Sequence, residues 1–460
     1  MMKKLLALLI FTASVAHAQF TIKGTMTPPE KDNWVMLHKL GGFKPTYVAN
    51  GTIEFDTVAV GGDKQVLGRF SINLPANAQS GVYRATYRNG GAGFIDFLFN
   101  KENVEFIFNP KYPEQSVVFT SSRENKLYKE YLEAYALVQR KIDSLLAEYI
   151  KNPNKDTKKE HKKVIKELED VQEIYQNKSE GMLAHHFIKA SQRYNSPSVF
   201  ESMDDYLNFT VDNFFKFVDF NNEHLYNSSF LIDRVNDYVF YLNVSDDAET
   251  QKNLHKEAIN TSLEKISKGK LRKDVIQFLI SAYTDKRDGE MVDWLFAEYF
   301  DNLPSEDQDA DFKTKTLKIL TATVGRIAPD FSWKEGEEEL KLSTLNDGEK
   351  YLLVFWSTAC PHCVNDVPKL HEYMQNHKTV SVISFGIENL EDEATWVEFT
   401  KNLPYWHNAI GTHPDHKWSN ETAEAYNLLG TPSYFVLDKD KKIIAMPNDI
   451  EDVEKYFEGH

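Results

Sequence analysis

Cysteine is nearly absent from this chain, with only Cys360 and Cys363 in 460 residues. One pair is too few for the disulfide framework of a small exported domain. A disulfide between two residues so close in sequence would also remove little entropy from the unfolded chain. The scarcity of cysteine therefore excludes a disulfide-stapled fold and favours a chemical role for the pair.

Positive charge is scarce relative to negative charge. The chain has 53 Lys and Arg residues against 69 Asp and Glu residues, which gives a formal net charge of −16 at pH 7. A nucleic acid partner needs a basic surface, so we expect no nucleic acid binding. Long apolar runs are also missing. No stretch beyond the N-terminal region reaches the about 20 residues that cross a bilayer, so we expect no transmembrane span in the mature chain.

The N-terminus has the pattern of a targeting segment. Lys3 and Lys4 precede an apolar run that begins at Leu5, and residues 16–18 (Ala-His-Ala) form a small-residue cleavage site. This pattern is typical of a cleavable secretory signal peptide, here residues 1–18. The apolar run is short for an uncleaved anchor helix of about 20 residues. We therefore predict a periplasmic or otherwise exported protein.

The rest of the chain changes character twice. In residues 19–120, short runs such as 70–74 and 104–108 alternate apolar and polar residues, which predicts an antiparallel β-sandwich domain. In residues 121–323, apolar residues recur at three- and four-residue steps, which predicts a helical domain. In residues 324–460, strands and helices alternate, which predicts a compact α/β domain. The expected fold class is therefore multidomain.

The two cysteines lie where a predicted strand gives way to a predicted helix. Residues 352–355 and Trp356 have the composition of a strand, and Cys360 opens a segment that can be helical. Two thiols separated by two residues at such a turn form a redox pair. The helix start stabilises a thiolate through its unpaired amides and its dipole. We predict that Cys360 is the exposed nucleophile and Cys363 the more buried resolving thiol.

Neighbouring residues fit this chemistry. Pro361 would lie in the first helical turn, where its missing N–H costs nothing. His362 would stabilise the thiolate further. Asp366 follows Cys363 by three residues on the same helix face and could take the proton of the resolving thiol. A plain surface carboxylate is the alternative interpretation of Asp366.

A second element precedes the predicted strand 434–437. A proline bend at Thr431 and Pro432 would bring the Thr431 backbone beside the sulfurs, where an extended substrate could pair with it. From physics alone, an ordinary trans proline is the default. Glu388 follows the predicted strand 380–385 and is a weaker candidate for the site.

A metal site has little support. Histidines at positions 407, 413 and 416 give a loop His-x-x-His pattern, which is more typical of a surface than of a metal site when no partners are fixed. We therefore predict no metal and no cofactor.

The motifs of the C-terminal region resemble, in content and order, those of the TlpA/ResA branch of the thioredoxin superfamily. The resemblance rests on residues 324–331, 341–345, 356–363 and 430–432, in about the last third of the mature chain. Less specifically, residues 19–120 resemble the β-domain found ahead of exported thioredoxin-like modules in Bacteroidota.

The resemblance implies a thioredoxin fold over residues 324–460, with Cys360 as nucleophile, Cys363 as resolver and Pro432 in cis. Asp366 falls where this branch often has a glutamate that transfers protons. The aspartate that thioredoxin buries before the motif is replaced here by Val354. That replacement leaves Asp366 or water to move the proton.

The resemblance also implies that substrate binds beside the motif and the proline bend. The expected substrate-binding residues are Trp356, Pro361, His362, Thr431 and Pro432. The Pro-His pair resembles that of the strongly oxidising DsbA. A histidine that stabilises the reduced thiolate raises the reduction potential, so this resemblance favours oxidation. Thr431 instead resembles reductase and isomerase members. The direction of electron flow stays open.

The function predicted from these features is an exported thiol–disulfide oxidoreductase that works through a mixed disulfide. Reduction of protein or peptide disulfides is the leading interpretation, and cytochrome c maturation is the family's example of it. A membrane electron donor or acceptor is then expected as a partner. Disulfide oxidation or isomerisation is the first alternative, and a partner-binding scaffold with a secondary redox module is the second. A peroxidase meets only half of its motif, since Leu353 and Ser357 stand where Pro and Thr or Ser are needed. A copper carrier using both thiols and a distant histidine is the last alternative.

Overall fold

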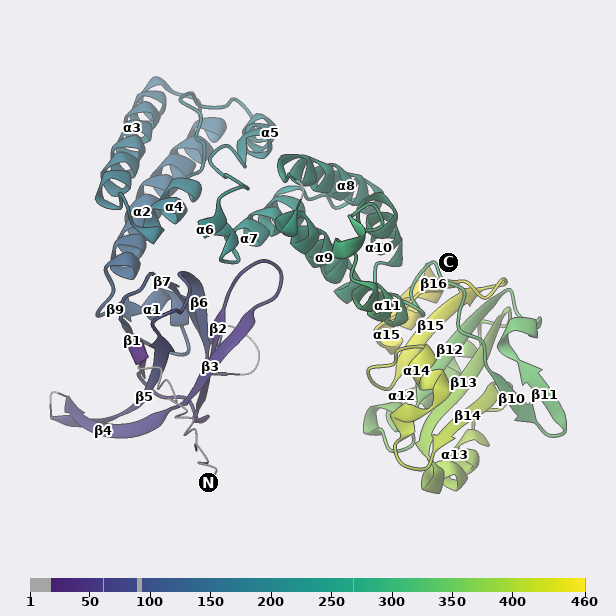
Figure 1. The fold of residues 1–460 in the computed structure, drawn as a ribbon. Helices are drawn as coiled ribbons and strands as arrows, with labels where there is room; N and C mark the ends of the chain where they lie inside the picture. Colours follow the sequence, from purple (N-terminus) through teal and green to yellow (C-terminus); the bar gives the residue numbers. More distant parts are fainter. Residues whose placement is uncertain (1–17, 61, 89–92, 268, 460) are drawn as a thin grey trace, which may run out of the picture. The chain divides into compact units, whose positions relative to one another are not determined.

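The computed structural model describes residues 18–60, 62–88, 93–267 and 269–459 (Figure 1). The predicted signal peptide lies outside these residues, apart from Ala18. The chain forms two compact units, residues 1–275 and 276–460. The predicted domain boundaries follow changes in secondary structure, at 120/121 and 323/324, and stay predictions. In the described residues, none of the helices combines the length and the apolar character that crossing a membrane requires.

The first unit begins with two sheets, in the orders β4-β5-β1-β8-β9 and β3-β2-β6-β7. β1 pairs antiparallel with β5 but parallel with β8, so the first sheet is mixed where the sequence predicted antiparallel pairing throughout. Alternating side chains reveal which face of a strand is buried, but not the direction of its neighbour. The elements are β1 (Ala18–Met26), β2 (Trp34–Lys39), β3 (Thr46–Thr52), β4 (Glu54–Val60), β5 (Asp63–Pro75), β6 (Gly81–Thr86), β7 (Phe94–Phe99), β8 (Val104–Phe108), α1 (Pro113–Ser116) and β9 (Val118–Phe119).

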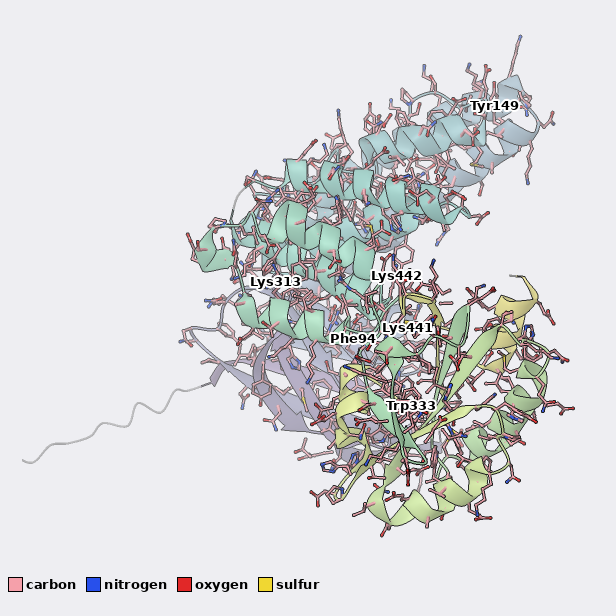
Figure 2. All side chains as sticks on the ribbon, turned by 90° about the vertical axis from the view of Figure 1, so that its right-hand side faces the viewer. Phe94, Tyr149, Lys313, Trp333, Lys441 and Lys442 are labelled. Atoms are coloured by element: carbon pink, nitrogen blue, oxygen red, sulfur yellow. The ribbon has the colours of Figure 1, made fainter. Side chains whose placement is uncertain are left out.

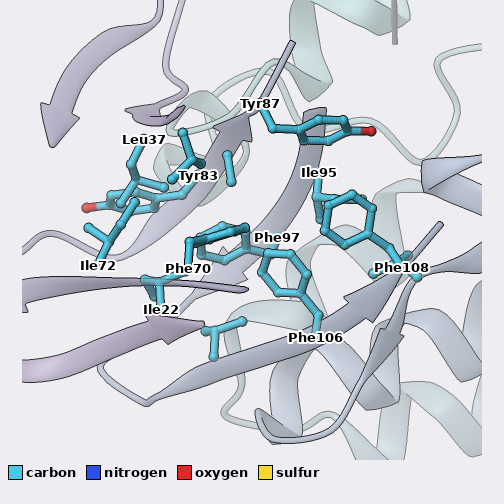
Figure 3. Close-up of a cluster of buried hydrophobic side chains, with 14 of the residues drawn as sticks. Ile22, Leu37, Phe70, Ile72, Tyr83, Tyr87, Ile95, Phe97, Phe106 and Phe108 are labelled. Atoms are coloured by element: carbon cyan, nitrogen blue, oxygen red, sulfur yellow. The ribbon is translucent and has the colours of Figure 1, made fainter. Parts of the chain in front are cut away.

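Side chains of both sheets meet in one apolar core (Figure 3). β8 alternates as its sequence predicts, with Val104, Phe106 and Phe108 buried. The Phe106 ring lies 5.8 Å from that of Phe97 on the other sheet. Each such buried aromatic side chain contributes about 1.5–3 kcal/mol through burial. A shared core between two sheets is the packing that a sandwich needs.

The central region is helical, as the periodicity predicts. α2 and α3 pack along one another (Figure 1), and each begins at a polar cap: the side chains of Ser122 and Asn154 accept from the amides of Asn125 and Thr157. The elements are α2 (Arg123–Lys151), α3 (Lys155–Lys178), α4 (Leu183–Ala190), α5 (Met203–Asn213), α6 (Glu223–Tyr226), α7 (Phe230–Asn236), η1 (Asp237–Leu242), α8 (Ala248–Lys265) and α9 (Lys270–Asp285), which spans the division between the units.

The second unit holds a five-stranded sheet in the order β14-β13-β12-β15-β16, preceded by short helices and a β10-β11 hairpin. β12, β13 and β14 are parallel, whereas β15 and β16 are antiparallel to their neighbours. The elements before the sheet are α10 (Gly289–Leu295), η2 (Phe296–Phe300), η3 (Ser305–Asp307), α11 (Ala310–Ile319), β10 (Ser332–Glu335), β11 (Glu338–Lys341) and η4 (Leu342–Thr344). Those of the sheet and its helices are β12 (Lys350–Trp356), α12 (Pro361–Met374), β13 (Val380–Asn389), η5 (Leu390–Asp392), α13 (Glu393–Thr400), β14 (His407–His413), η6 (Lys417–Ser419), α14 (Glu421–Ala425), β15 (Ser433–Asp438), β16 (Ile443–Ala445) and α15 (Ile450–Glu458).

β12 lies at the centre of this sheet and is buried on both faces. Its side chains divide between two cores, one containing Tyr351, Leu353 and Phe355 and the other containing Val354 and Trp356. Continuous apolar composition is what a strand covered on both faces requires. The carboxyl end of this rigid strand leads directly into the turn that carries the cysteines.

Candidate active site

Cys360 is the N-cap residue of α12. Its Sγ accepts a hydrogen bond from the Cys363 amide at 3.3 Å, and Pro361 occupies the first turn. The cap satisfies one of the amides that a helix start leaves unpaired. Cys360 is partly exposed, whereas Cys363 is fully buried, and both are free thiols. The strand-to-helix turn thus presents one sulfur to solvent and keeps the other beneath it.

The two thiols have opposite electrostatic environments. Burial raises the pKa of the Cys360 thiol, but hydrogen bonds donated by Cys363, the Thr431 side chain and the His362 backbone outweigh it and lower the net pKa. Burial raises the pKa of Cys363 to about 12, and its bond to the Cys360 sulfur adds to that rise. At neutral pH the exposed sulfur is therefore the more readily ionised one.

The proline bend lies against the exposed sulfur. The Thr431–Pro432 peptide is cis, as the resemblance implies. In its protonated form, the Cys360 thiol donates to the Thr431 carbonyl oxygen at 3.3 Å. The thiolate would lose that bond and keep those donated to it. β15 starts at the next residue, Ser433, so the bend is fixed to the sheet.

The other predicted residues lie in different environments. Pro361 and His362 are exposed at the start of α12. Trp356, predicted among the substrate-binding residues, is fully buried in the core under the site, where its indole N–H donates to Ser384 Oγ at 2.7 Å. The Asp366 side chain is 26% exposed and lies 3.4 Å from Lys369 Nζ.

A buried carboxylate holds the loop that leads to Cys360. Glu388, at the end of β13, is fully buried. Its two oxygens accept from the Thr358 amide at 2.5 Å and from Ser357 Oγ at 3.0 Å. Lys417 Nζ donates to the same Ser357 Oγ at 2.8 Å. Glu388 was only a weaker candidate from the sequence, because no local pattern indicates that the end of β13 meets the turn after β12.

Sequence reasoning missed Tyr434. This tyrosine on β15 is 2% exposed, and its hydroxyl has no hydrogen-bond partner among the residues that the structure describes. It pairs in register with Val354 of β12. The signal that could have found it is its place two residues after Pro432, at the start of a strand beside the cysteines.

The histidine loop does not come together as a metal site. The ring of His407 contacts Glu335 through Nδ1 and Asp347 through Nε2, each at 2.7 Å. It also lies edge-on to Trp333, 5.6 Å away, which Figure 2 labels. Burial lowers the pKa of His407, but the two carboxylates outweigh this and raise it. Within the described part of the chain, no group of three or more His, Cys, Asp or Glu side chains is arranged to hold a metal ion.

Part of this chain is similar in sequence to known proteins. Residues 324–446 match the model of the AhpC/TSA family. The thiol-disulfide oxidoreductase ResA of Geobacillus kaustophilus is 26% identical over 140 residues, which cover 30% of this chain and 77% of ResA. The thioredoxin-like protein YneN of Bacillus subtilis is 29% identical over 138 residues, which cover 28% of this chain and 73% of YneN.

Two solved structures align with parts of this chain. A thioredoxin-like protein from Bacteroides caccae aligns over 58% of this chain and 99% of its own, with 16% identity and a TM-score of 0.39. The thioredoxin domain of a thiol-disulfide oxidoreductase from Bacteroides vulgatus aligns over 30% of this chain and 96% of its own, with 20% identity and a TM-score of 0.26. Given the family match and the sheet described above, residues 324–446 form a thioredoxin-like domain of the AhpC/TSA type, with ResA and YneN among its homologues.

Proposed function

We propose that this protein is an exported thiol–disulfide oxidoreductase that reduces disulfides in other proteins through Cys360 and Cys363. The observation that carries the proposal is the pair of sulfurs at the start of α12, one partly exposed with a lowered pKa and one buried with a raised pKa. This asymmetry is what a two-step exchange needs. The signal-like pattern of residues 1–18 supports export.

The reaction has two steps. The Cys360 thiolate attacks one sulfur of the substrate disulfide, whose S–S bond breaks, and the other substrate sulfur leaves and takes up a proton. Cys363 then loses its proton to Asp366 or to water and attacks Cys360 Sγ. The second substrate sulfur leaves, so the substrate gains two electrons and the protein holds a Cys360–Cys363 disulfide. A membrane electron donor would return that disulfide to the dithiol.

The surface around Cys360 suits a protein substrate. Leu429, just before the proline bend, is 84% exposed, and Val364, just after the cysteines, is 38% exposed. We expect these two apolar side chains to contact the substrate protein near Cys360. The Thr431 backbone, at 3.3 Å from Cys360 Sγ, would pair with an extended segment that carries the substrate disulfide.

The proposal is tested by the reduction of insulin disulfides with dithiothreitol as the electron source. The wild-type chain should accelerate precipitation of the insulin B chain, and Cys360→Ala should abolish this activity. Cys363→Ser should form the mixed disulfide but fail to resolve it, and so accumulate covalent adducts on non-reducing gels. Full activity in Cys360→Ala would contradict the proposal.

Disulfide oxidation is the second candidate, because His362 lies between the two cysteines, where a hydrogen bond donated by its imidazole would stabilise the reduced thiolate. The reduction potential separates the two directions. A value near −270 mV, as in thioredoxin, supports a reductase, whereas a value near −120 mV, as in DsbA, supports an oxidase. His362→Ala should lower the potential in either case.

A further inference from the structure

The helical segment of residues 276–323 packs against α14, the helix that leads into the proline bend. Ala322, near the end of this segment, is fully buried in the same core as Tyr426. Lys318 Nζ lies 3.9 Å from the Glu424 carboxylate of α14. The segment belongs to the same compact unit as the two cysteines. Its contacts with the thioredoxin-like domain are therefore internal to that unit.

Arg287 follows α9 in a backbone conformation that favours glycine. The Arg287 amide donates to the Thr284 carbonyl oxygen and the Asp288 amide donates to that of Tyr283, each at 2.9 Å. These two bonds form the Schellman motif that ends many helices, and Arg287 takes its left-handed position with a φ of +53°. Glycine is the usual residue there, because a side chain is strained. An arginine at this position calls for an explanation.

The side chain of Arg287 reaches the start of the cis-proline loop, which we define as residues 427–432. Its Nη2 donates to the Asn427 carbonyl oxygen at 3.0 Å. Asn427 takes the equivalent left-handed position after α14, with a φ of +45°; its amide donates to Glu424, and the Leu428 amide donates to Ala423. Arginine side chains near a helix C-terminus bind its last carbonyls in this way. The bond therefore joins the ends of two helices, one from the helical segment and one from the thioredoxin-like domain.

The Arg287 guanidinium is partly buried without an acidic partner. Burial lowers its pKa, and among the described residues no carboxylate offsets that effect. Loss of solvent is unfavourable for a cation that is not paired with an anion. This side chain thus keeps its bond to the Asn427 carbonyl where an ion pair would have been more favourable.

The cis-proline loop carries the group that would pair with substrate. The Thr431 carbonyl oxygen lies 3.3 Å from Cys360 Sγ. At the second end of the loop, Ser433 Oγ donates to the Gly430 carbonyl oxygen at 2.8 Å, and β15 begins. Between the two ends, Leu429 is 84% exposed, and a side chain at Gly430 would point into open space. The position of the loop therefore depends on its two ends, and the bond from the helical segment holds the first.

We propose that Arg287 is a positioning residue of the exchange reaction: by binding the Asn427 carbonyl, it sets the cis-proline loop so that the Thr431 backbone pairs with an extended protein substrate. This inference rests on the proposed function and deepens it, because it gives the helical segment a part in binding protein substrates. Arg287 takes no part in the bond changes at sulfur. Small disulfides have no peptide backbone to pair with the loop, so their reduction does not depend on Arg287.

The test compares a peptide disulfide with a small disulfide, using the full-length protein in its reduced form. The substrates are the disulfide-linked dimer of a short peptide with one central cysteine, and bis(2-hydroxyethyl) disulfide. Each is added in excess over a range of concentrations, and oxidation of the protein is followed by acid quenching and maleimide labelling of the remaining thiols. In Arg287→Gln the half-saturating concentration of the peptide disulfide should rise by about three- to tenfold, as expected for a lost hydrogen bond. Its maximal rate and the rates with the small disulfide should not change.

Two further variants separate positioning from folding. Arg287→Gly also loses the side chain but suits the left-handed backbone, so it should unfold at a higher denaturant concentration than Arg287→Gln and still bind the peptide weakly. Arg326→Gln breaks another contact of the helical segment, the ion pair with Asp293 at 2.5 Å. It should leave the kinetics with both substrates unchanged.

The outcomes distinguish the two proposals. An Arg287→Gln variant that binds the peptide disulfide as the wild type does overturns the positioning role. An equal loss with both substrates, or a return of peptide binding in Arg287→Gly, overturns it as well. A wild-type protein that is oxidised by neither disulfide contradicts the proposed function itself, whatever the variants do.

Discussion

The N-terminal β-region and the C-terminal sheet differ in the polar groups that they bury. In the described part of residues 18–120, every buried side chain is apolar or aromatic, and the two buried tyrosines, Tyr83 and Tyr87, donate to backbone carbonyls. The C-terminal sheet buries the carboxylate of Glu388. Near its strands it also leaves three buried polar atoms without partners among the described residues: Trp396 Nε1, Asn408 Oδ1 and Tyr434 OH.

The N-terminal core follows the packing rules for buried polar groups, whereas the C-terminal domain, which contains the cysteines, departs from them. A core of apolar side chains with all its hydroxyls paired gains stability from burial alone. A core with a buried carboxylate, two thiols and an unpaired phenol gives up part of that gain. Functional sites are where such departures are expected.

The largest effect is expected in the N-terminal core. Phe106→Ala removes a fully buried ring and should lower the free energy of unfolding of the first unit by about 3–5 kcal/mol, because a cavity remains. Phe55→Ala, at a side chain 48% exposed on β4, is the control and should cost less than about 0.5 kcal/mol. Urea denaturation followed by circular dichroism measures both. Equal losses would contradict the assignment of the core.

The next effect concerns the reactivity of the two cysteines. At pH 7, iodoacetamide should alkylate Cys360 at least about a hundredfold faster than Cys363, since a lowered pKa supplies thiolate at the exposed sulfur and burial withholds it at the other. The alkylation rate of Cys360 should reach half its maximum at a lower pH than the alkylation rate of a free cysteine does. Peptide mass spectrometry assigns the sites. Similar rates at the two positions would remove the asymmetry that the proposed reaction needs.

A smaller effect is expected for the buried carboxylate. Glu388→Gln keeps the shape of the side chain but loses the charge that accepts from the Thr358 amide and Ser357 Oγ. We expect the second unit to lose about 1–3 kcal/mol of stability and Cys360 to react more slowly, because the loop before it loosens. Glu391→Gln, at an exposed position two residues beyond the end of β13, should change neither quantity. Unchanged stability in Glu388→Gln would show that the bonds to the loop contribute little.

The smallest effect is a pH dependence at His407. Its pKa is raised in the folded protein, so its contribution to stability is fully present below the ordinary histidine value near 6.5 and is lost as pH rises through the raised folded value. The second unit should therefore lose about 1 kcal/mol of stability between about pH 6 and pH 9. His407→Gln should flatten this change, whereas His416→Gln, at an exposed residue, should retain it. A persistent slope in His407→Gln would assign the dependence to other groups.

Local sequence was enough to predict the redox turn. Strand composition before Trp356, a cap-competent cysteine and a proline in the first helical turn are all read within a dozen residues, and α12 begins at Pro361 as they indicate. The parallel pairing of β1 with β8 was beyond the sequence, because those strands are separated by most of the N-terminal region. The same holds for Glu388, whose partners in the turn lie about thirty residues before it.

The residues that carry the chemistry can be read from the sequence: two thiols with two residues between them, a helix that starts at the first and a proline bend before a later strand. How these residues are tuned depends on the fold. It buries Cys363, sets the Thr431 carbonyl 3.3 Å from Cys360, places a carboxylate under the loop and leaves the Tyr434 hydroxyl unpaired. A thiol pKa depends on desolvation and on nearby donors, and the fold sets both by bringing together segments from distant parts of the chain.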